Sequence, residues 1–124
     1  MDILQIVRLW LADQGIDANI DNVQVAVGEN GLFPLGQQVL QEREDVLGGI
    51  RRRVRYSFLL RHMAIPGEET AQKLLGLQQT ATKNPPRLGE NQLFRAERGK
   101  LQKNASTGLA IYELRLIAER EETQ

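Results

Sequence analysis

The segment from Ile50 to Ala64 constrains the fold more than any other part of the chain, because it is long and rich in valine, tyrosine, phenylalanine and leucine. These residue types favour β-strands. Successive side chains of a strand point to opposite faces of its sheet, so the segment predicts one apolar face and one basic face. The apolar face carries Val54, Tyr56, Phe58 and Leu60, and the basic face carries Arg51, Arg53, Arg55 and Arg61.

A second strand is predicted from Gln37 to Glu44, and the glycine-rich segment that follows it predicts a turn. The two strands are expected to form an antiparallel hairpin. A register that places Glu44 opposite Arg51 also places Glu42 opposite Arg53. Exposed cross-strand pairs of opposite charge stabilise a hairpin by about 0.2–1 kcal/mol each. The sequence therefore predicts a hairpin braced by these two ion pairs.

The basic face of the long strand has two interpretations. In the first, its arginines only brace the hairpin. In the second, the face meets a nucleic acid or an acidic partner. The two interpretations can hold together, because the predicted ion pairs leave two arginines over, Arg55 and Arg61.

Two segments show the helical spacing of apolar residues. The first helix is expected to begin at Asp2, which can cap it, and to end at Gly15. Its apolar stripe consists of Ile3, Ile6, Val7, Trp10 and Leu11. Within that stripe Trp10 is interpreted as a packing residue. The second helix is expected to begin within residues 66–70 and to end at Asn84-Pro85-Pro86. Its mostly apolar face consists of Ala71, Leu74, Leu75 and Gln78.

The stretch between the first helix and the hairpin gives weaker signals. Residues 19–22 are polar and typical of a turn. Residues 23–27 alternate as a half-buried strand does. Residues 32–36 are predicted to form an apolar loop around Pro34.

The last third of the chain predicts a second hairpin. Strands are expected over residues 94–103 and 109–118, joined by a turn over residues 104–108. The charged residues 119–124 are expected to fray. Few helical crossovers separate the strands, so the sheet should be mainly antiparallel. We therefore expect an α+β fold, a single domain spanning residues 1–124, with two helices packed on one face of the sheet.

The composition narrows the function classes. The 124 residues include 16 basic and 16 acidic side chains, so the formal net charge is zero, whereas a free nucleic-acid-binding protein usually has a basic excess. The absence of cysteine excludes disulfides, thiolate metal sites and thiol nucleophiles. The apolar runs are too short to cross a bilayer, and the N-terminus lacks the basic start and cleavage site of a signal peptide.

No segment carries a recognisable catalytic motif. The one histidine, His62, lies within the long predicted strand and is interpreted as a packing or hydrogen-bonding residue. The chain has no nucleophile elbow and no phosphate-binding glycine loop. Its acidic pairs, Glu68-Glu69 and Glu121-Glu122, are expected to be solvated. We therefore expect no enzymatic activity, no cofactor, no metal and no membrane association.

Several segments together resemble a family of small proteins from tailed phages and prophages, often described as minor capsid proteins and similar to the tail-terminator or tail-completion superfamily. The resemblance covers most of the chain and rests on loop and strand signatures. These are Leu4-Gln5-Ile6-Val7 with Trp10-Leu11, Gly31-Leu32-Phe33-Pro34 with Gly36, Arg43-Glu44-Asp45-Val46-Leu47-Gly48, Arg55-Tyr56-Ser57-Phe58, Arg95-Ala96-Glu97-Arg98-Gly99-Lys100-Leu101 and Gly108-Leu109-Ala110-Ile111-Tyr112-Glu113-Leu114.

The resemblance implies a structural protein of the virion, assembled in the cytoplasm of the bacterial host. Such a protein forms a homo-oligomeric ring, typically a hexamer, at the head-proximal end of the tail. Its partners would be the tail-tube protein, the head-side connector, the sheath in a contractile tail, and DNA that passes without sequence-specific contacts. Phage tail and headless tail-like bacteriocin remain alternatives, as do another head–tail connector, a head-completion protein and a nucleic-acid-binding accessory protein.

If the protein forms such a ring, two groups of residues are expected, one at the contact between subunits and one at the axial channel. An exposed apolar loop and free strand edges would find a neighbouring subunit, although Phe33 has the alternative of folding back on its own sheet. The expected subunit interface consists of Leu32, Phe33, Leu35, Glu42, Glu44, Arg51 and Arg53. The two remaining arginines, Arg55 and Arg61, are expected to face the axial channel.

Overall fold

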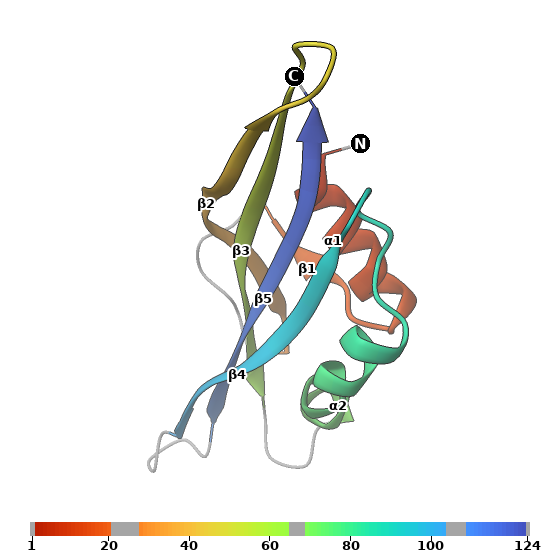
Figure 1. Ribbon diagram of the computed structural model, residues 1–124. Helices are drawn as coiled ribbons and strands as arrows, with labels where there is room; N and C mark the ends of the chain where they lie inside the picture. Colours follow the sequence, from red (N-terminus) through yellow and green to blue (C-terminus); the bar gives the residue numbers. More distant parts are fainter. Residues whose placement is uncertain (1, 21–27, 65–68, 104–108, 124) are drawn as a thin grey trace.

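The computed structural model describes residues 2–20, 28–64, 69–103 and 109–123. Two helices and five strands follow one another along the chain: α1 (Ile3–Asp13), β1 (Ala18–Asn19), β2 (Asn30–Glu44), β3 (Ile50–Ala64), α2 (Glu69–Lys83), β4 (Leu93–Lys103) and β5 (Ala110–Thr123). The strands form one sheet in the order β1-β2-β3-β5-β4, antiparallel except between β1 and β2. Both helices lie on the same side of this curled sheet (Figure 1). The predicted α+β fold is confirmed.

The central strand, β3, has the two faces that its sequence predicts. Along its length, Val54, Phe58, Leu60, His62 and Ala64 are buried, whereas the residues between them are only half-buried. Of these, Phe58 and Leu60 belong to the core cluster that also contains residues of both helices. The arginines therefore lie on the opposite face of the sheet.

Helix α1 is capped and buried as predicted. The Asp2 side chain accepts a hydrogen bond from the backbone N–H of Leu4 at 2.9 Å, which satisfies a free donor of the first turn. Trp10 lies in the core. Its ring meets Phe94 of β4 edge-on at 5.0 Å between centroids, and its Nε1–H donates to the Asn84 carbonyl oxygen at 2.7 Å. The packing interpretation of Trp10 is confirmed.

Helix α2 ends where the sequence predicts, but it buries a different stripe. Its last residue is Lys83, directly before Asn84-Pro85-Pro86. Leu74 is buried as expected, whereas Leu75 and Gln78 are exposed. Steps of three and four residues follow one side of a helix, and here that side carries Leu74, Leu77 and Ala81. The side chain of Ala71 lies outside the described part of the molecule.

Strand β2 includes the segment predicted to be an apolar loop, and that prediction is wrong. Residues 32–36 pair with β3, with a register shift between Pro34 and Gly36. Proline has no N–H to donate and is tolerated at a bulge, while Gly36 adopts φ +149°, which favours glycine. Asn19, predicted in a turn, pairs with Gly31 in the short β1–β2 ladder. The predictions for residues 23–27 and 104–108 fall outside the described residues.

The predicted hairpin register is wrong by one residue. Glu42 lies opposite Arg52, and Glu44 lies opposite Ile50. A slip of one residue moves each side chain to the other face. As a result Glu42 forms an ion pair with Arg52 at 3.3 Å, and Arg53 faces away from both glutamates.

The turn sets this register. The Asp45 carboxylate accepts hydrogen bonds from the N–H groups of Leu47 and Gly49 at 2.9 and 2.8 Å. Its own backbone N–H donates to the Gly49 carbonyl at 2.7 Å. Asp45 and Gly49 therefore face each other, and the next residues outward, Glu44 and Ile50, must pair.

The predicted frayed end is also wrong, because β5 runs on to Thr123 beside β3. Glu119 is 5% exposed. Glu121 and Glu122, expected to be solvated, are half-buried and lie opposite Arg53 and Arg52 in the β3–β5 register. Glu119 and Glu121 form ion pairs with arginines of β3, and Glu122 accepts hydrogen bonds from Tyr56 of β3 and from Arg120. These contacts explain why a polar end of the chain stays in the sheet.

Candidate functional site

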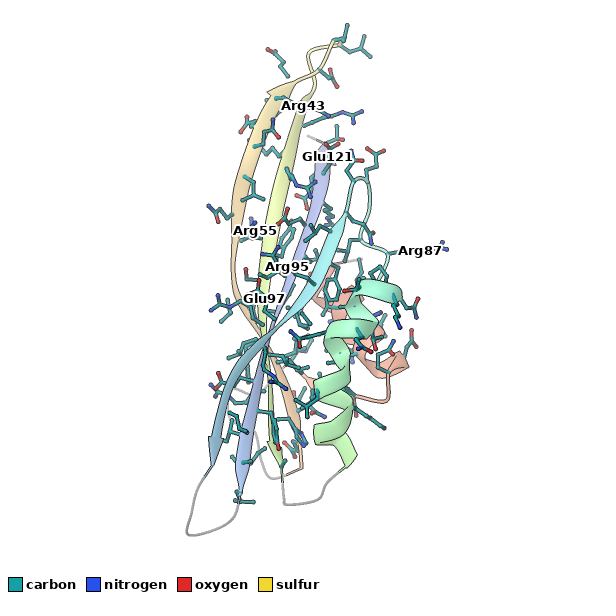
Figure 2. The ribbon with its side chains drawn as sticks, turned by 60° about the horizontal axis from the view of Figure 1, so that its bottom comes forward. Arg43, Arg55, Arg87, Arg95, Glu97 and Glu121 are labelled. Carbon is teal, nitrogen blue, oxygen red and sulfur yellow. The ribbon has the colours of Figure 1, made fainter. Side chains whose placement is uncertain are left out.

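The sheet face that the helices leave uncovered, here called the outer face, is densely charged. Seven arginines and four glutamates of the strands point to it, so arginines exceed carboxylates there even though the whole chain is neutral. The arginines are Arg43, Arg51, Arg53, Arg55, Arg61, Arg95 and Arg115, and the glutamates are Glu97, Glu113, Glu119 and Glu121. Figure 2 shows Arg55, Arg95 and Glu97 on the sheet and Arg87 pointing away from it.

Glu119 organises the middle of the outer face. It accepts hydrogen bonds from Nε of Arg53 at 3.1 Å and from Nε of Arg55 at 2.9 Å, one on each carboxylate oxygen. Burial raises the pKa of Glu119, but the hydrogen bonds from Arg55 and Arg53 and their charges outweigh it, so the pKa lies below its ordinary value of 4.5. The carboxylate is therefore held ionised between two arginines.

The expectation that Arg55 and Arg61 are left without partners is wrong. Arg55 is held by Glu119, and Arg61 donates to Glu113 at 3.0 Å. The Arg61 guanidinium also lies 5.9 Å from the centre of the Phe33 ring, a distance at which a cation attracts an aromatic face. The carboxylates come from β5, a strand whose partner could not be read from the sequence.

The upper end of the outer face holds weaker, more exposed pairs. The guanidinium groups of Arg43 and Arg51 lie 3.4 and 3.6 Å from the Glu121 carboxylate. Arg51 also lies 3.5 Å from the carboxylate of Glu90, in the loop before β4. Ion pairs of this length at an exposed surface contribute about 1 kcal/mol or less. They orient the arginines more than they stabilise the fold.

A shallow depression of about 310 Å³ opens on the outer face beside the bulge at Gly36. Arg55, Ser57 and Arg115 line it, together with Leu35 to Gln38 of β2. Arg115 and Ser57 have no hydrogen-bond or ion-pair partner among the described residues. Sequence reasoning missed Arg115, although its place between the apolar Leu114 and Leu116 was a signal that it points outward.

Strand β2 presents a free edge. It pairs with β1 only through Asn30 and Gly31, so the rest of its outer edge is unpaired in the described structure. Three apolar side chains are exposed in this part of β2: Leu35, Val39 and Leu40. Of the other expected interface residues, Leu32 is buried in the core, and Phe33 is half-buried on its own sheet under Arg61.

A polar cluster closes the helix side of the sheet near its upper end. The Tyr56 hydroxyl donates to Glu122, which also accepts from Arg120 at 2.9 Å, and Arg120 donates to the Leu88 carbonyl at 3.0 Å. Burial and the hydrogen bond to Glu122 raise the pKa of Tyr56 above 10.0. Burial raises the pKa of Glu122, but the hydrogen bonds from Tyr56 and Arg120 bring it below 4.5. The cluster ties the loop before β4 to the sheet.

The buried histidine has a structural role. His62 is fully buried, and its Nδ1 lies 3.1 Å from the Glu29 carbonyl oxygen, which confirms the packing and hydrogen-bonding interpretation. Within the described ranges, no cluster of three histidine, cysteine, aspartate or glutamate side chains could hold a metal ion. No helix of those ranges is long and apolar enough to cross a membrane.

The chain matches no known protein-family model, and no curated protein matches it significantly. The geometry therefore carries the functional argument. The described surface offers a free strand edge with exposed apolar side chains and a face of ordered arginines. Such surfaces bind other protein subunits and negatively charged polymers.

Proposed function

We propose that the chain is a structural subunit of a phage or phage-like tail, forming a ring that ends the tail tube and joins it to the head-side connector. The observation that carries the proposal is the β2 edge, which is unpaired beyond Gly31 in the described part of the chain and has the exposed side chains Leu35, Val39 and Leu40. A monomeric protein usually protects such an edge with charges, prolines or a covering segment. β2 has a proline and a bulge at Pro34–Gly36, but beyond them its edge is unpaired among the described residues and Val39 and Leu40 are exposed, which suits a neighbouring subunit.

The sheet offers two different edges for assembly. β2 lies near one side of the sheet and β4 forms the other. Two different surfaces on one subunit allow head-to-tail contacts, which close into a ring when the rotation between subunits permits. The resemblance to tail terminators supports a ring of about six copies. Of the expected interface residues, Leu35, Glu42 and Glu44 are exposed on the single chain.

The outer face is the proposed wall of the axial channel. Arg55 and Arg61 lie on it, each held by a glutamate. Because the positive charge of the paired arginines is partly neutralised, the surface can contact a nucleic acid without binding it tightly. The proposed partners are therefore the tail-tube protein, the connector, a sheath in a contractile tail, and passing DNA.

Electron microscopy of intact tails tests the proposal. Labelled copies of this chain should form a ring at the head-proximal end of the tube, with Arg55 and Arg61 toward the lumen. A baseplate position, or a single copy in each tail, would contradict it. If both arginines lay on the outer wall or in a subunit contact, the channel role would be wrong while the ring could stand.

A second candidate function is direct contact with nucleic acid by an isolated subunit. The depression at Arg115 favours it, because an unpaired guanidinium, the Ser57 hydroxyl and the Arg55 side chain converge there. Such groups bind phosphate oxygens. Binding to a short duplex should weaken as salt rises. Arg115→Gln should weaken it. Arg87→Gln should not, because Arg87 points away from the sheet and has no partner in the described part of the chain.

A further inference from the structure

The tip of the β2–β3 hairpin exposes two apolar side chains. Val46 and Leu47 are almost completely accessible to solvent, Leu47 at 95%. They form the end of a projecting arm (Figure 1). The neighbouring Glu44 is exposed and has no partner among the described residues. The tip, defined here as residues 44–47, therefore combines two apolar side chains with a free carboxylate.

An apolar groove lies at the opposite end of the molecule, between α2 and the lower parts of β4 and β5. It has a volume of about 250 Å³ and is lined by Leu74, Leu75, Arg98, Gly99, Leu101, Tyr112, Glu113 and Leu114. Leu75 and Leu101 are about half exposed. Arg98 is exposed and has no partner in the described part of the chain. Its lining is mostly apolar, and among the described lining residues Arg98 is a charged side chain without a partner, whereas Glu113 is paired with Arg61.

From these two surfaces we infer that the hairpin tip of one copy binds the groove of another. The apolar side chains of Val46 and Leu47 would enter the groove, and Glu44 would meet Arg98. Neither Glu44 nor Arg98 has a partner among the described residues of its own chain, so pairing them between chains satisfies both. Removal of the two exposed side chains from water drives the contact.

The positions of the two surfaces determine the kind of assembly. The tip and the groove lie at opposite ends of one subunit, so each copy can donate its tip and receive another. This contact is heterologous and leads to rings or filaments instead of a closed two-fold dimer. The contact is small compared with a stable interface of about 1,200–2,000 Å². It therefore works together with the β2 edge, and isolated subunits associate weakly.

Disulfide capture tests the contact directly, because the chain has no cysteine of its own. A Leu47→Cys variant is mixed with a differently tagged Leu75→Cys variant and oxidised. Leu9→Cys replaces Leu75→Cys in the control mixture, since Leu9 on α1 and Leu75 on α2 are similarly exposed, at 44% and 42%. The mixed dimer should form several-fold more in the first mixture. Equal yields would overturn the inference.

A charge exchange uses the same readout. Glu44→Arg in the tip variant should lower the yield with the groove variant, by up to about fivefold for an exposed pair. Arg98→Glu in the groove variant should then restore it. A yield that stays low would show that these two residues do not pair, and the tip–groove contact as inferred would be wrong. The experiment reports self-association alone, whereas microscopy of tails tests separately where the assembly sits.

Discussion

The Arg55 guanidinium lies 2.9 Å from the carboxylate of Glu119, a contact that joins the central strand to a segment expected to fray. Glu119→Gln would leave the guanidinium groups of Arg53 and Arg55 without their charged acceptor. Because both arginines are partly solvated, we expect a loss of about 1–3 kcal/mol in the free energy of unfolding. Glu97→Gln breaks an exposed pair with Arg95 and should stay within about 0.5 kcal/mol of the parent in denaturant titrations.

Stability should fall toward acidic pH. Glu119 and Glu122 have folded-state pKa values below 4.5, so the folded protein binds fewer protons than the unfolded chain. Their contribution is present above about pH 4.5 and is lost as the pH falls through the lower folded-state values. Unfolding measured from neutral to acidic pH should show this decline. The decline should be shallower in Glu119→Gln, and an unchanged profile would contradict the assignment.

The tyrosine in the polar cluster acts in the opposite direction. The folded-state pKa of Tyr56 is above 10.0, so folding favours its protonated form. That contribution is present below pH 10 and is lost as the pH rises through the folded-state value. Spectrophotometric titration of the folded protein should show a tyrosine component that titrates above pH 10. Tyr56→Phe should remove this component. The loss of stability toward acidic pH should stay unchanged in the variant, apart from the contribution of Glu122.

The hairpin register can be tested by a double-mutant cycle. Glu42 pairs with Arg52 and not with Arg53. Combining Glu42→Arg with Arg52→Glu should show favourable coupling of about 0.2–1 kcal/mol. The same change at Glu42 combined with Arg53→Glu should show none. The reverse result would restore the register predicted from the sequence.

Two glycines should respond to alanine with opposite signs. A Cβ on Gly99 would clash with the backbone carbonyl of Glu113 on the neighbouring strand, so Gly99→Ala should destabilise the fold by about 1–3 kcal/mol. A Cβ on Gly76 in α2 meets open space. Gly76→Ala should therefore stabilise the helix by about 0.5–1 kcal/mol. Thermal unfolding of both variants measures the difference.

The faces of β3 could be predicted from sequence because period-two alternation is a local property of the chain. The same is true of the Asp2 cap and the Trp10 stripe of α1. These features depend on neighbours within a few residues. The sequence therefore identified the buried and the charged face of the sheet correctly.

The partners across the sheet could not be predicted in this way. The hairpin register depends on the hydrogen bonds of Asp45 to Leu47 and Gly49, which the sequence pattern left open by one residue. The partners of Arg55 and Arg61 lie on β5, more than 50 residues along the chain. Opposite charges nearby in sequence, at Glu42 and Glu44, suggested pairs that the geometry does not make. The position of the Arg115 guanidinium in the depression of the outer face also depends on the pairing of β5 with β3, which the sequence pattern does not give.

The turn at Asp45 also has a consequence for recognition. Its side chain accepts hydrogen bonds from the N–H groups of Leu47 and Gly49, and Gly48 adopts φ +84°, so contacts within the single chain already favour this conformation of the loop. A loop that is already ordered loses little conformational entropy when it binds. The arm is therefore preorganised, and the strength of its contact depends mainly on the surface that receives it. Asp45→Ala would keep the two apolar side chains, Val46 and Leu47, but would remove the hydrogen bonds that order the loop. Binding would then cost the conformational entropy of ordering the loop.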